Sequence, residues 1–399
     1  MSYKRLGDVV EFVSKRNIDG EATILYGINI DKFFMPSVAN IIGVDLTKYK
    51  VVNKFQFACN RMHVGRDKRL PISMSSHDYK FIVSPAYDVF EVTADDVLPE
   101  YLMMWFRRSE FDRECWFYTD ADVRGGLSLD TLKSIEIEIP SIDKQRAIVA
   151  EYQSIENKIA INNQICEKLE ATAQALYRHW FVDFEFPNEE GKPYKSSGGA
   201  MVYNEEMEKE IPEGWEVGSF THIFKLTGGG TPSTDNPGYW NGSIPFFTPA
   251  DSTKSSYVID TFKYITELGF KESSTKLYPK NTIFITARGT VGEITLSGYA
   301  MAMNQSCYAI KDDHPYFTLQ SSLSIIELLK SEAIGAVFSA LVTRDFEQRM
   351  VLNPLIKTKS KFDFTCFPIY ELLLLKTKEI YKMTRLQSLL LSRLAKQAN

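Results

Sequence analysis

The sequence predicts an α+β fold in which two mixed, mostly β domains with short helices are each followed by one long helix. The first observation behind this prediction is a stretch between Ser141 and Phe186 that has helical periodicity and contains neither Pro nor Gly. The second is a stripe of the same spacing near the C-terminus, 214 residues downstream. The third is that the same offset aligns segments outside the helices, which indicates a degenerate tandem repeat.

The central helix is expected over residues 141–184. Its apolar positions recur at alternating steps of four and three, the heptad spacing of a helix that packs along a partner helix. These seam positions are Ile155, Ile159, Asn162, Cys166, Leu169, Ala173, Leu176 and Trp180. About 40 residues at ~1.5 Å each give a rod of roughly 60 Å, much longer than an ordinary globular helix.

The C-terminal helix, assigned to residues 354–399, supplies the matching seam. Its positions are Ile369, Leu373, Lys376, Ile380, Met383, Gln387, Leu390 and Leu394. Asn162 and Lys376 occupy matched positions, and polar seam residues of this kind reduce stability while fixing the register of the helices. Pro368 either occupies the first turn of this helix, leaving about 45 Å, or marks a kink inside it.

The two domains are expected at residues 1–140 and 215–353, with a linker at 185–214. In the first domain, short strands such as TILYGINI and IEIEIP and one helix after Pro99 are predicted. The linker is rich in Pro, Gly, Ser and Glu, which is typical of a surface connection. The 214-residue offset pairs Leu6, Val9, Phe12, Ile137 and Pro140 with Phe220, Ile223, Leu226, Val351 and Pro354.

Composition and motifs exclude several classes of protein. The five cysteines are odd in number and form no Cys-x-x-Cys pair, so neither a disulfide framework nor a zinc site is indicated. A net charge of −5 argues against a generic nucleic-acid coat. The chain shows no signal sequence, no membrane span, and no Walker, methyltransferase, metalloprotease or nucleophile-elbow motif. A cytoplasmic protein without a catalytic constellation is expected.

One window of the first domain is strongly basic. Residues 48–69 hold seven Lys and Arg against one acid, a local charge of +6. The window is either an ordinary solvated face or a surface that lies on phosphate, and the sequence favours neither. The candidate DNA-binding residues here are Lys54, Arg61, His63, Arg66, Lys68 and Arg69.

The second domain has a Gly-rich loop and two further candidate segments. The loop contributes Gly229, Gly230 and Thr231, but it continues Thr-Pro-Ser rather than Gly-Lys-Ser, so a turn is favoured over a nucleotide P-loop. Its functional alternative is backbone amides beside a DNA phosphate. Asn304 and Gln305 either form a turn or read adenine.

An internal match adds a further arginine. The pattern F-x-x-x-R-x-x-V-G pairs Phe57 and Arg61 with Phe284 and Arg288, at an offset of 227. This offset predicts an insertion of 13 residues in the second domain, around its Gly-rich loop. Each arginine either caps a strand end or contacts phosphate or guanine.

Several motifs occur in a fixed order: IPSIDKQRAIVAEYQSIENKIAINNQICEKLEATAQALYRHWFVDFEF, IPEGW, GGTPSTDNPGYWNGSIPF, ITARGTVG and MNQSCYAI. Together they closely resemble the specificity subunit of type I restriction–modification systems, over nearly the whole chain. The resemblance implies a non-catalytic subunit with two target recognition domains, joined by two long antiparallel coiled-coil helices in a pseudo-twofold repeat. Each recognition domain would read one half of a split site, and the helical pair would set the gap between the halves.

The resemblance also implies partners. These are double-stranded DNA, two copies of a DNA methyltransferase subunit bound at the helical region, and a restriction and translocation subunit. S-adenosylmethionine, ATP and Mg²⁺ would belong to those partners, with no cofactor in this chain. The alternatives left open are a coiled-coil interaction scaffold without DNA contact and an enzyme whose catalytic residues go unrecognised.

Overall fold

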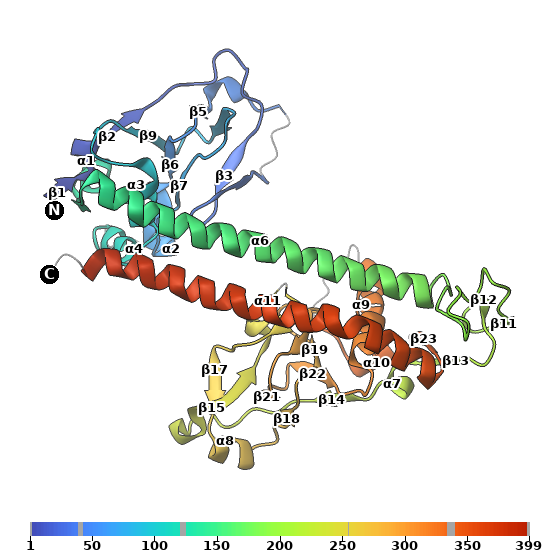
Figure 1. The fold of residues 1–399 in the computed structure, drawn as a ribbon. Coiled ribbons are helices and arrows are strands. Elements are labelled where there is room, and N and C mark those ends of the chain that lie inside the picture. Colours follow the sequence, from blue (N-terminus) through green and yellow to red (C-terminus); the bar gives the residue numbers. More distant parts are fainter. Residues whose placement is uncertain (1, 39–42, 120–124, 254, 333–339, 397–399) are drawn as a thin grey trace. The chain divides into compact units, whose positions relative to one another are not determined.

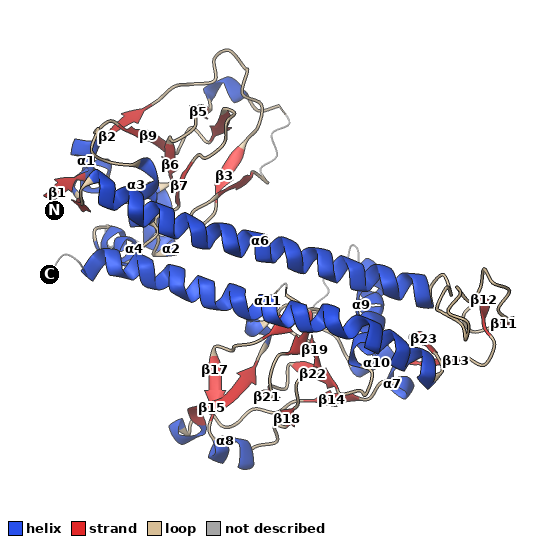
Figure 2. Ribbon diagram, viewed as in Figure 1, coloured by secondary structure: helices blue, strands red, loops and turns tan. Residues whose placement is uncertain are grey.

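The computed structural model describes residues 2–38, 43–119, 125–253, 255–332 and 340–396. They fold as two compact units, shown in Figure 1 and, by secondary structure, in Figure 2. Unit 1 consists of Met1–Lys158 together with Met383–Asn399, and unit 2 consists of Ile159–Lys382. Each unit therefore contains one recognition-type domain and a part of both long helices.

The two long helices are α6, Ile142–Phe181, and α11, Ile356–Lys396. Both predicted helices are confirmed, and α11 runs through Pro368, which lies inside the helix rather than at its first turn. Within unit 2 the helices are antiparallel. Asn162 bonds to Glu379, whereas Trp180, further along α6, packs against Phe362, further back on α11, with ring centroids 5.6 Å apart.

The seam residues predicted from the heptad spacing all lie at buried or half-buried positions on these helices. Ala173 and Leu373 are nearly inaccessible, and Ile155 is buried within unit 1. Apolar seam burial supplies most of the stability of such helices, because isolated helices are marginal in water.

The domain of unit 1 is built on a four-stranded antiparallel sheet in the order β2-β9-β6-β7. Three further strand pairs, β1–β10, β3–β4 and β5–β8, surround it. Its strands are β1 Ser2–Arg5, β2 Val10–Val13, β3 Tyr26–Ile28, β4 Phe34–Pro36, β5 Lys50–Val52, β6 Phe57–Cys59, β7 Ile72–Met74, β8 Phe81–Val83, β9 Asp88–Val92 and β10 Glu136–Ile139. Its helices are α1 Leu6–Val9, α2 Val64–Asp67, α3 Pro99–Phe106, α4 Ser109–Phe117 and α5 Leu129–Ser134, with short 3₁₀ turns at Leu46–Lys48 and Arg61–His63.

Unit 2 repeats this plan with additions. Its main sheet has the order β14-β22-β19-β20-β16, and a second sheet has the order β17-β15-β21-β18. The strands are β11 Met201–Asn204, β12 Lys209–Pro212, β13 Glu216–Ser219, β14 Leu226–Gly228, β15 Trp240–Phe247, β16 Tyr257–Val258, β17 Lys263–Ile265, β18 Leu277–Tyr278, β19 Ile283–Thr286, β20 Ile294–Ser297, β21 Met301–Met303, β22 Cys307–Ile310 and β23 Met350–Asn353. The helices are α7 Phe220–Ile223, α8 Glu267–Lys271, α9 Pro315–Glu332 and α10 Thr343–Glu347, with 3₁₀ turns at Pro237–Tyr239 and Pro249–Asp251.

The tandem repeat is confirmed at the level of individual strand pairs. In unit 1, β1 pairs with β10 in the register Ser2 to Ile139. In unit 2, β13 pairs with β23 in the register Glu216 to Asn353, and both residues are displaced by 214. The following helices, α1 and α7, begin at Leu6 and Phe220, displaced by the same number.

The pairing of Phe57 with Phe284 is wrong by one residue. Phe57 packs in the cluster that contains Tyr152 of α6, whereas Phe284 packs on the opposite side of its sheet, with Phe247. A slip of one residue reverses the face of a strand, so Ile283, which packs with Trp180, is the counterpart of Phe57.

The loops after β6 and β19 show the same shift of one residue for the two arginines. Leu127 N donates to Arg61 O, and Leu341 N, 214 residues later, donates to Ala287 O. Arg61 therefore corresponds to Ala287, and Arg288 stands one position beyond. The offset at this strand is 226, so the net insertion upstream is 12 residues rather than 13.

Two local predictions also differ from the structure. The single helix expected after Pro99 is two helices, because the backbone of Arg108 is extended between α3 and α4. Its guanidinium carbon lies 3.9 Å from the centre of the Trp105 ring. The segment 185–214 is not an irregular connection: it contains the hairpin β11–β12, and Phe186 stacks between Tyr194 and Trp215.

Candidate nucleic-acid interface

The three candidate segments of the second domain meet at one edge of its main sheet. Gly228 at the end of β14 pairs with Tyr308 near the start of β22, and Cys307 pairs with Thr286 at the end of β19. The loops that leave or enter these strands therefore share an edge. Figure 1 shows the three strands side by side in unit 2.

The Gly-rich loop packs directly on the Asn304–Gln305 turn. Gly230 N donates to Met303 O at 3.0 Å, and Thr231 Oγ1 donates to Gln305 Oε1. A Cβ at Gly229 would overlap the carbonyl oxygens of Met303 and Asn304, so only glycine fits there. The glycine thus has a steric role, and Gln305 remains exposed at the surface.

Arg288 lies beside this turn. Ala287 N donates to Ser306 O at 2.8 Å, which fixes the start of the Arg288 loop against the turn. Arg288 is exposed, and among the described residues it has no hydrogen-bond or ion-pair partner. An unpaired guanidinium next to an exposed amide is suited to contact phosphate or a base edge.

Arg344 of α10 is a residue that the sequence analysis missed. Its helix follows Leu341, whose N–H bonds to Ala287 O, and Thr343 Oγ1 lies 3.4 Å from the Tyr308 hydroxyl. The exposed Arg344 thus extends the same edge. No sequence pattern connects Arg344 with Arg288, because only the return of the chain to β19 brings them together.

The corresponding edge of unit 1 carries two further residues that were missed. At the 214-residue offset, Lys15 and Arg16 correspond to Gly229 and Gly230. They lie shortly after the end of β2. Both are exposed, and Val51 N donates to Lys15 O at 2.8 Å. The repeat offset was sufficient to find them, since it already aligned Phe12 with Leu226. Unit 1 thus has cations where unit 2 has a glycine loop.

The guanidinium of Arg61 is bound within the fold of unit 1. Its Nε lies 2.5 Å from Asp88 Oδ2 and its Nη1 donates to the carbonyl of Leu127, with 18% of the side chain exposed. A guanidinium held by a carboxylate and a carbonyl in a half-buried site contributes to the fold. Of Arg61 and Arg288, only Arg288 is therefore free to contact a ligand.

Five of the seven cations in the basic window 48–69 form ion pairs, four of them with acids from other parts of unit 1 and Arg66 with Asp67 of the window itself. The ion pairs are Lys48 with Asp45, Lys54 with Asp78, Arg61 with Asp88, Arg66 with Asp67, and Arg69 with Asp31. The hydrogen bond from Lys54 lowers the pKa of Asp78, and that from Arg66 lowers the pKa of Asp67. Most of these pairs are exposed, so they are weak and can be exchanged for phosphate contacts.

Lys68 and His63 complete the window. Lys68 has a left-handed backbone with φ of 56°, and its Nζ lies 5.0 Å from the centre of the Trp116 ring. His63 is exposed at the end of a short 3₁₀ turn. Both remain candidates for DNA contact.

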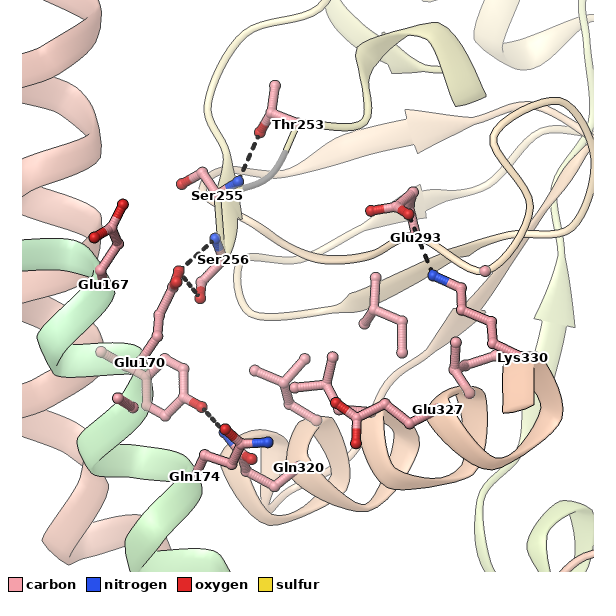
Figure 3. A pocket seen from close by; sticks show the side chains of 17 residues that line it. Glu167, Glu170, Gln174, Thr253, Ser255, Ser256, Glu293, Gln320, Glu327 and Lys330 are labelled. Carbon is pink, nitrogen blue, oxygen red and sulfur yellow. Dashed lines mark hydrogen bonds and ion pairs between the residues drawn. The ribbon is translucent and has the colours of Figure 1, made fainter. Parts of the chain in front are cut away.

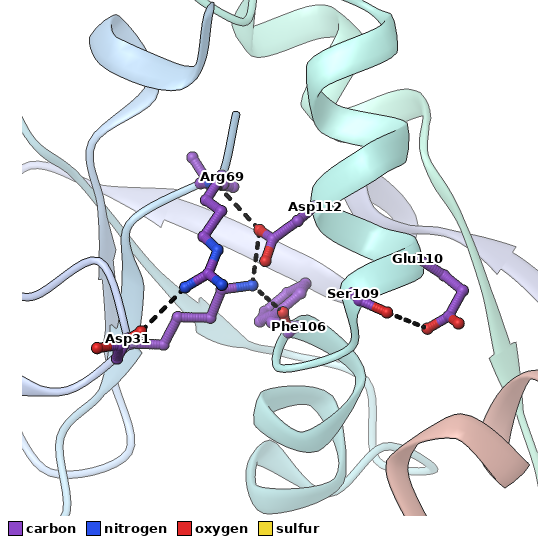
Figure 4. A network of polar contacts seen from close by, with 8 residues as sticks. Asp31, Arg69, Phe106, Ser109, Glu110 and Asp112 are labelled. Atoms are coloured by element: carbon purple, nitrogen blue, oxygen red, sulfur yellow. Dashed lines mark hydrogen bonds and ion pairs between the residues drawn. The ribbon is translucent and has the colours of Figure 1, made fainter. Parts of the chain in front are cut away.

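Arg69 stands beside a buried ion pair, shown in Figure 4. Lys32 Nζ lies 2.8 Å from Asp112 Oδ1 and also donates to Phe106 O, while Asp112 accepts from Leu70 N at 3.0 Å. Burial lowers the pKa of Lys32, and the Asp112 carboxylate opposes that shift. This network attaches the β3–β4 hairpin to α3 and α4.

Unit 2 also contains a cavity of about 530 Å³ between α6, α9 and the loop before β16, shown in Figure 3. Four carboxylates and one lysine line it: Glu167, Glu170, Glu293, Glu327 and Lys330. Glu170 accepts hydrogen bonds from Ser256, and Lys330 lies 3.3 Å from Glu293. The excess of negative charge makes this cavity unsuitable for nucleic acid.

The described part of the chain contains no group of three or more His, Cys, Asp or Glu side chains that could hold a metal ion. None of the described helices is both long enough and apolar enough to cross a membrane. Burial raises the pKa of the Cys59, Cys115, Cys307 and Cys366 thiols, as in inert structural cysteines.

A family model described as the type I restriction modification DNA specificity domain matches residues 1–171 and again residues 212–360. The chain belongs to this family. It is a type I specificity subunit, the non-catalytic DNA-recognition component of such systems. The two matches coincide with the two halves of the repeat, which agrees with the paired strand registers of β1–β10 and β13–β23.

Individual relatives support the assignment. The chain is 23% identical to the HindI specificity subunit of Haemophilus influenzae, over 98% of this chain and 97% of the relative. It is 26% identical to the MjaIX specificity subunit of Methanocaldococcus jannaschii, over 76% of this chain and 69% of the relative. The crystal structure of the type I S subunit from M. genitalium has the same fold, with a TM-score of 0.57, 11% identity and coverage of 98% of this chain and 95% of that one.

Proposed function

We propose that this specificity subunit reads a bipartite DNA site, with one recognition domain on each half. What supports the proposal is the repeat itself. The same sheet order, β2-β9-β6-β7 and β14-β22-β19-β20, occurs in both units, and the outer strand pairs share one register offset. Two copies of one reading module are suited to a site made of two halves.

The sheet edges described above are the proposed contact surfaces. In unit 2, Arg288, Gln305 and Arg344 provide cationic and amide groups on exposed loops. In unit 1, Lys15 and Arg16 occupy the corresponding edge. Cationic side chains contact phosphates and fix the position of the protein, whereas arginine and glutamine can also read guanine and adenine edges. The two domains carry different side chains there, so they are expected to read different sequences.

The long helices have the two remaining roles in this proposal. They set the gap between the half-sites, and they bind two copies of a methyltransferase subunit, to which a restriction and translocation subunit can be added. S-adenosylmethionine, ATP and Mg²⁺ are assigned to those partners. The negative charge of this chain, −5, is compatible with this arrangement because partner subunits would contribute to the DNA-binding surface.

The decisive experiment is base-resolution methylation sequencing of DNA from cells that carry this chain with its methyltransferase partner. Cells without the chain are the control. A new motif of two short halves around a fixed gap is expected. Exchange of residues 1–140 for the corresponding domain of another specificity subunit should then change one half only. A change in both halves, or in neither, would contradict the modular proposal.

The spacing role has a separate test. Insertion of one heptad into each long helix, after Lys158 and after Lys382, keeps both seams in phase. Each insertion adds about 10 Å of helix, equivalent to roughly three base pairs. The methylated motif should keep both halves and acquire a longer gap. An unchanged gap would show that the helices do not set the spacing.

A further inference from the structure

Three consecutive aromatic side chains are exposed at the C-terminal end of α4. Trp116 is 43% exposed, Phe117 79% and Tyr118 50%. The core of unit 1 is contacted instead by Phe111 and Cys115, earlier on the same helix. We call Trp116, Phe117 and Tyr118 the α4 tip. A single exposed apolar side chain is ordinary on a protein surface, but a contiguous set marks an interaction site.

The repeat shows that this helix does not need aromatic residues at its end. The 214-residue offset holds across the helix, because the buried residues Phe111 and Cys115 correspond to the buried residues Ile325 and Leu329 of α9. The α4 tip corresponds to residues 330–332, which read Lys-Ser-Glu and are exposed. The aromatic residues are therefore specific to the first half of the repeat, and the shared fold does not require them.

The α4 tip lies at the sheet edge of unit 1 that carries Lys15 and Arg16. Lys68 Nζ lies 5.0 Å from the centre of the Trp116 ring, and Lys68 belongs to the loop between β6 and β7. The strands β2 and β6 end at this edge, and β7 and β9 begin there. The α4 tip is thus continuous with the surface proposed to contact DNA.

Lys68 supplies a positive charge at the α4 tip that no acid neutralises. Among the described residues it forms no ion pair, and its Nζ lies over the Trp116 ring. Arg113, one turn before Phe117 on α4, is 71% exposed and lies 3.4 Å from Glu110. An apolar protein surface would leave the Lys68 ammonium without a counter-charge, whereas DNA offers a phosphate for the ammonium and base faces for the rings. Charge and position therefore both favour DNA as the occupant.

Phe117 has the properties of a side chain that enters a base stack. Its ring carries no polar atom and is the most exposed of the three, and it meets the Tyr118 ring edge-on with centroids 5.3 Å apart. Thr119 Oγ1 donates to Trp116 O at 2.7 Å, which closes the end of the helix beneath it. Apolar side chains presented in this way can separate two base pairs and kink the duplex.

We propose that Phe117 inserts between two adjacent base pairs of the half-site read by unit 1 and kinks the DNA there, while Lys68 contacts a neighbouring phosphate. The opened step is a pyrimidine–purine step, because these steps unstack most readily. Unit 1 therefore reads part of its half-site through the deformability of the DNA, and unit 2 does not. This inference rests on the proposed function, which supplies the DNA. It adds a second mode of reading and assigns it to one residue.

The test uses the full-length chain with its own methyltransferase subunit, on a duplex that carries the methylated motif. Exchange of residues 1–140 identifies the half-site of unit 1. 2-Aminopurine, whose fluorescence rises when it is unstacked, is placed at successive purine positions of both halves. A rise is expected at one pyrimidine–purine step of the unit 1 half, apart from any rise at the methylated base.

Phe117→Ala should abolish that rise and straighten the DNA, as measured by energy transfer between labels at the two ends. It should also lower the affinity for the duplex by about 10-fold, the loss of one stacked side chain. Phe117→Leu keeps an apolar wedge and should retain the unstacked step. Phe262→Ala is the matched control, because Phe262 is 82% exposed but lies in unit 2, and it should change neither fluorescence nor affinity.

All three variants alter exposed side chains, so their urea midpoints and their assembly with the methyltransferase subunit should be natural. Three results would overturn the inference. These are a unit 1 half that stays stacked apart from the methylated base, an unstacked step that persists in Phe117→Ala, and a Phe117→Ala chain that no longer binds the methyltransferase subunit. The last result would make the α4 tip a protein contact.

The proposed function fails differently from this inference. Absence of a split methylated motif would refute the reading role, and the inference with it. A split motif whose unit 1 half remains stacked in the complex would refute the inference alone and leave the reading role intact.

Discussion

Asn162 Nδ2 donates to Glu379 Oε2 at 3.0 Å, in a seam where the Asn162 side chain is fully buried. Lys376 Nζ approaches the same oxygen at 2.9 Å. The Oδ1 atom of Asn162 has no hydrogen-bond partner among the described residues. The polar pair expected to fix the register of the helices thus lies at an interhelical contact, and one polar atom there is unsatisfied.

Asn162→Leu should stabilise the protein against unfolding. The substitution removes the unsatisfied amide oxygen and adds apolar burial, while Lys376 remains to pair with Glu379. We expect the free energy of unfolding to rise by about 1 kcal/mol or more. Urea denaturation of the full chain measures this, with Asn163→Leu on the exposed side of the same turn as the control. A lower midpoint for Asn162→Leu would show that the hydrogen bond to Glu379 outweighs the buried polar atom.

The buried pair of Lys32 and Asp112 is expected to matter much more than the exposed pair beside it. Lys32→Met leaves the Asp112 carboxylate buried without its cation, which should reduce the free energy of unfolding by about 3–5 kcal/mol. Arg69→Met removes only the exposed ion pair with Asp31 and should change it by less than about 1 kcal/mol. Denaturant unfolding of both variants gives the comparison. Equal effects would mean that the pair in Figure 4 is not a structural centre of unit 1.

Asp363 should make the stability of unit 2 depend on pH. This carboxyl accepts from the N–H groups of Tyr316 and Phe317 at the start of α9, and burial raises its pKa to about 7. A raised folded pKa means that the stabilising contribution is present at low pH and is lost as pH rises through about 7.

Asp363→Asn removes this titration, because asparagine stays neutral and keeps one acceptor for the α9 amides. The quantity to compare is the free energy of unfolding of Asp363→Asn minus that of the natural chain. This difference should increase by roughly 2–3 kcal/mol when the pH is raised from 5 to 8. Urea unfolding at both pH values is the measurement, with Asp313→Asn, an exposed carboxyl before α9, as the control. A difference that stays constant with pH would contradict a raised pKa at Asp363.

Arg61 and Arg288 should behave in opposite ways. Arg61→Ala removes a half-buried ion pair with Asp88 and should reduce the free energy of unfolding by about 1–3 kcal/mol. Arg288→Ala should leave stability within about 0.5 kcal/mol, because the side chain is exposed.

In DNA binding the order of the two effects should reverse, so that Arg288→Ala has a larger effect than Arg61→Ala. If Arg288 contacts a phosphate, its loss should lower affinity for all sequences and reduce the salt slope by about one. If it contacts a base, one position of the methylated motif should become degenerate. Binding titrations at several salt concentrations, with the partner methyltransferase present, distinguish the two. An Arg288→Ala complex with natural affinity and motif would remove Arg288 from the interface.

The long helices, their seams and the repeat followed from the sequence alone. Heptad spacing and a fixed offset are properties of the order of residues, so α6, α11 and the matched strands β10 and β23 needed no tertiary information. The two-residue period of strands was less informative. All of Phe57, Ala58 and Cys59 are buried, so no alternation marks which face each residue occupies, and the alignment with Phe284 slipped by one.

Only the tertiary structure decided which charged side chains are paired and which side chains are exposed at the surface. The acids that pair with the basic window, such as Asp31, Asp78 and Asp88, come from segments outside the window, because long-range pairing is set by the fold and not by local composition. The same holds for the edge that joins Arg288 to Arg344, and for the exposure of Phe117 on a helix whose other side is buried. Local order thus determined the elements, and the packing of distant segments determined which of their side chains remain free to bind.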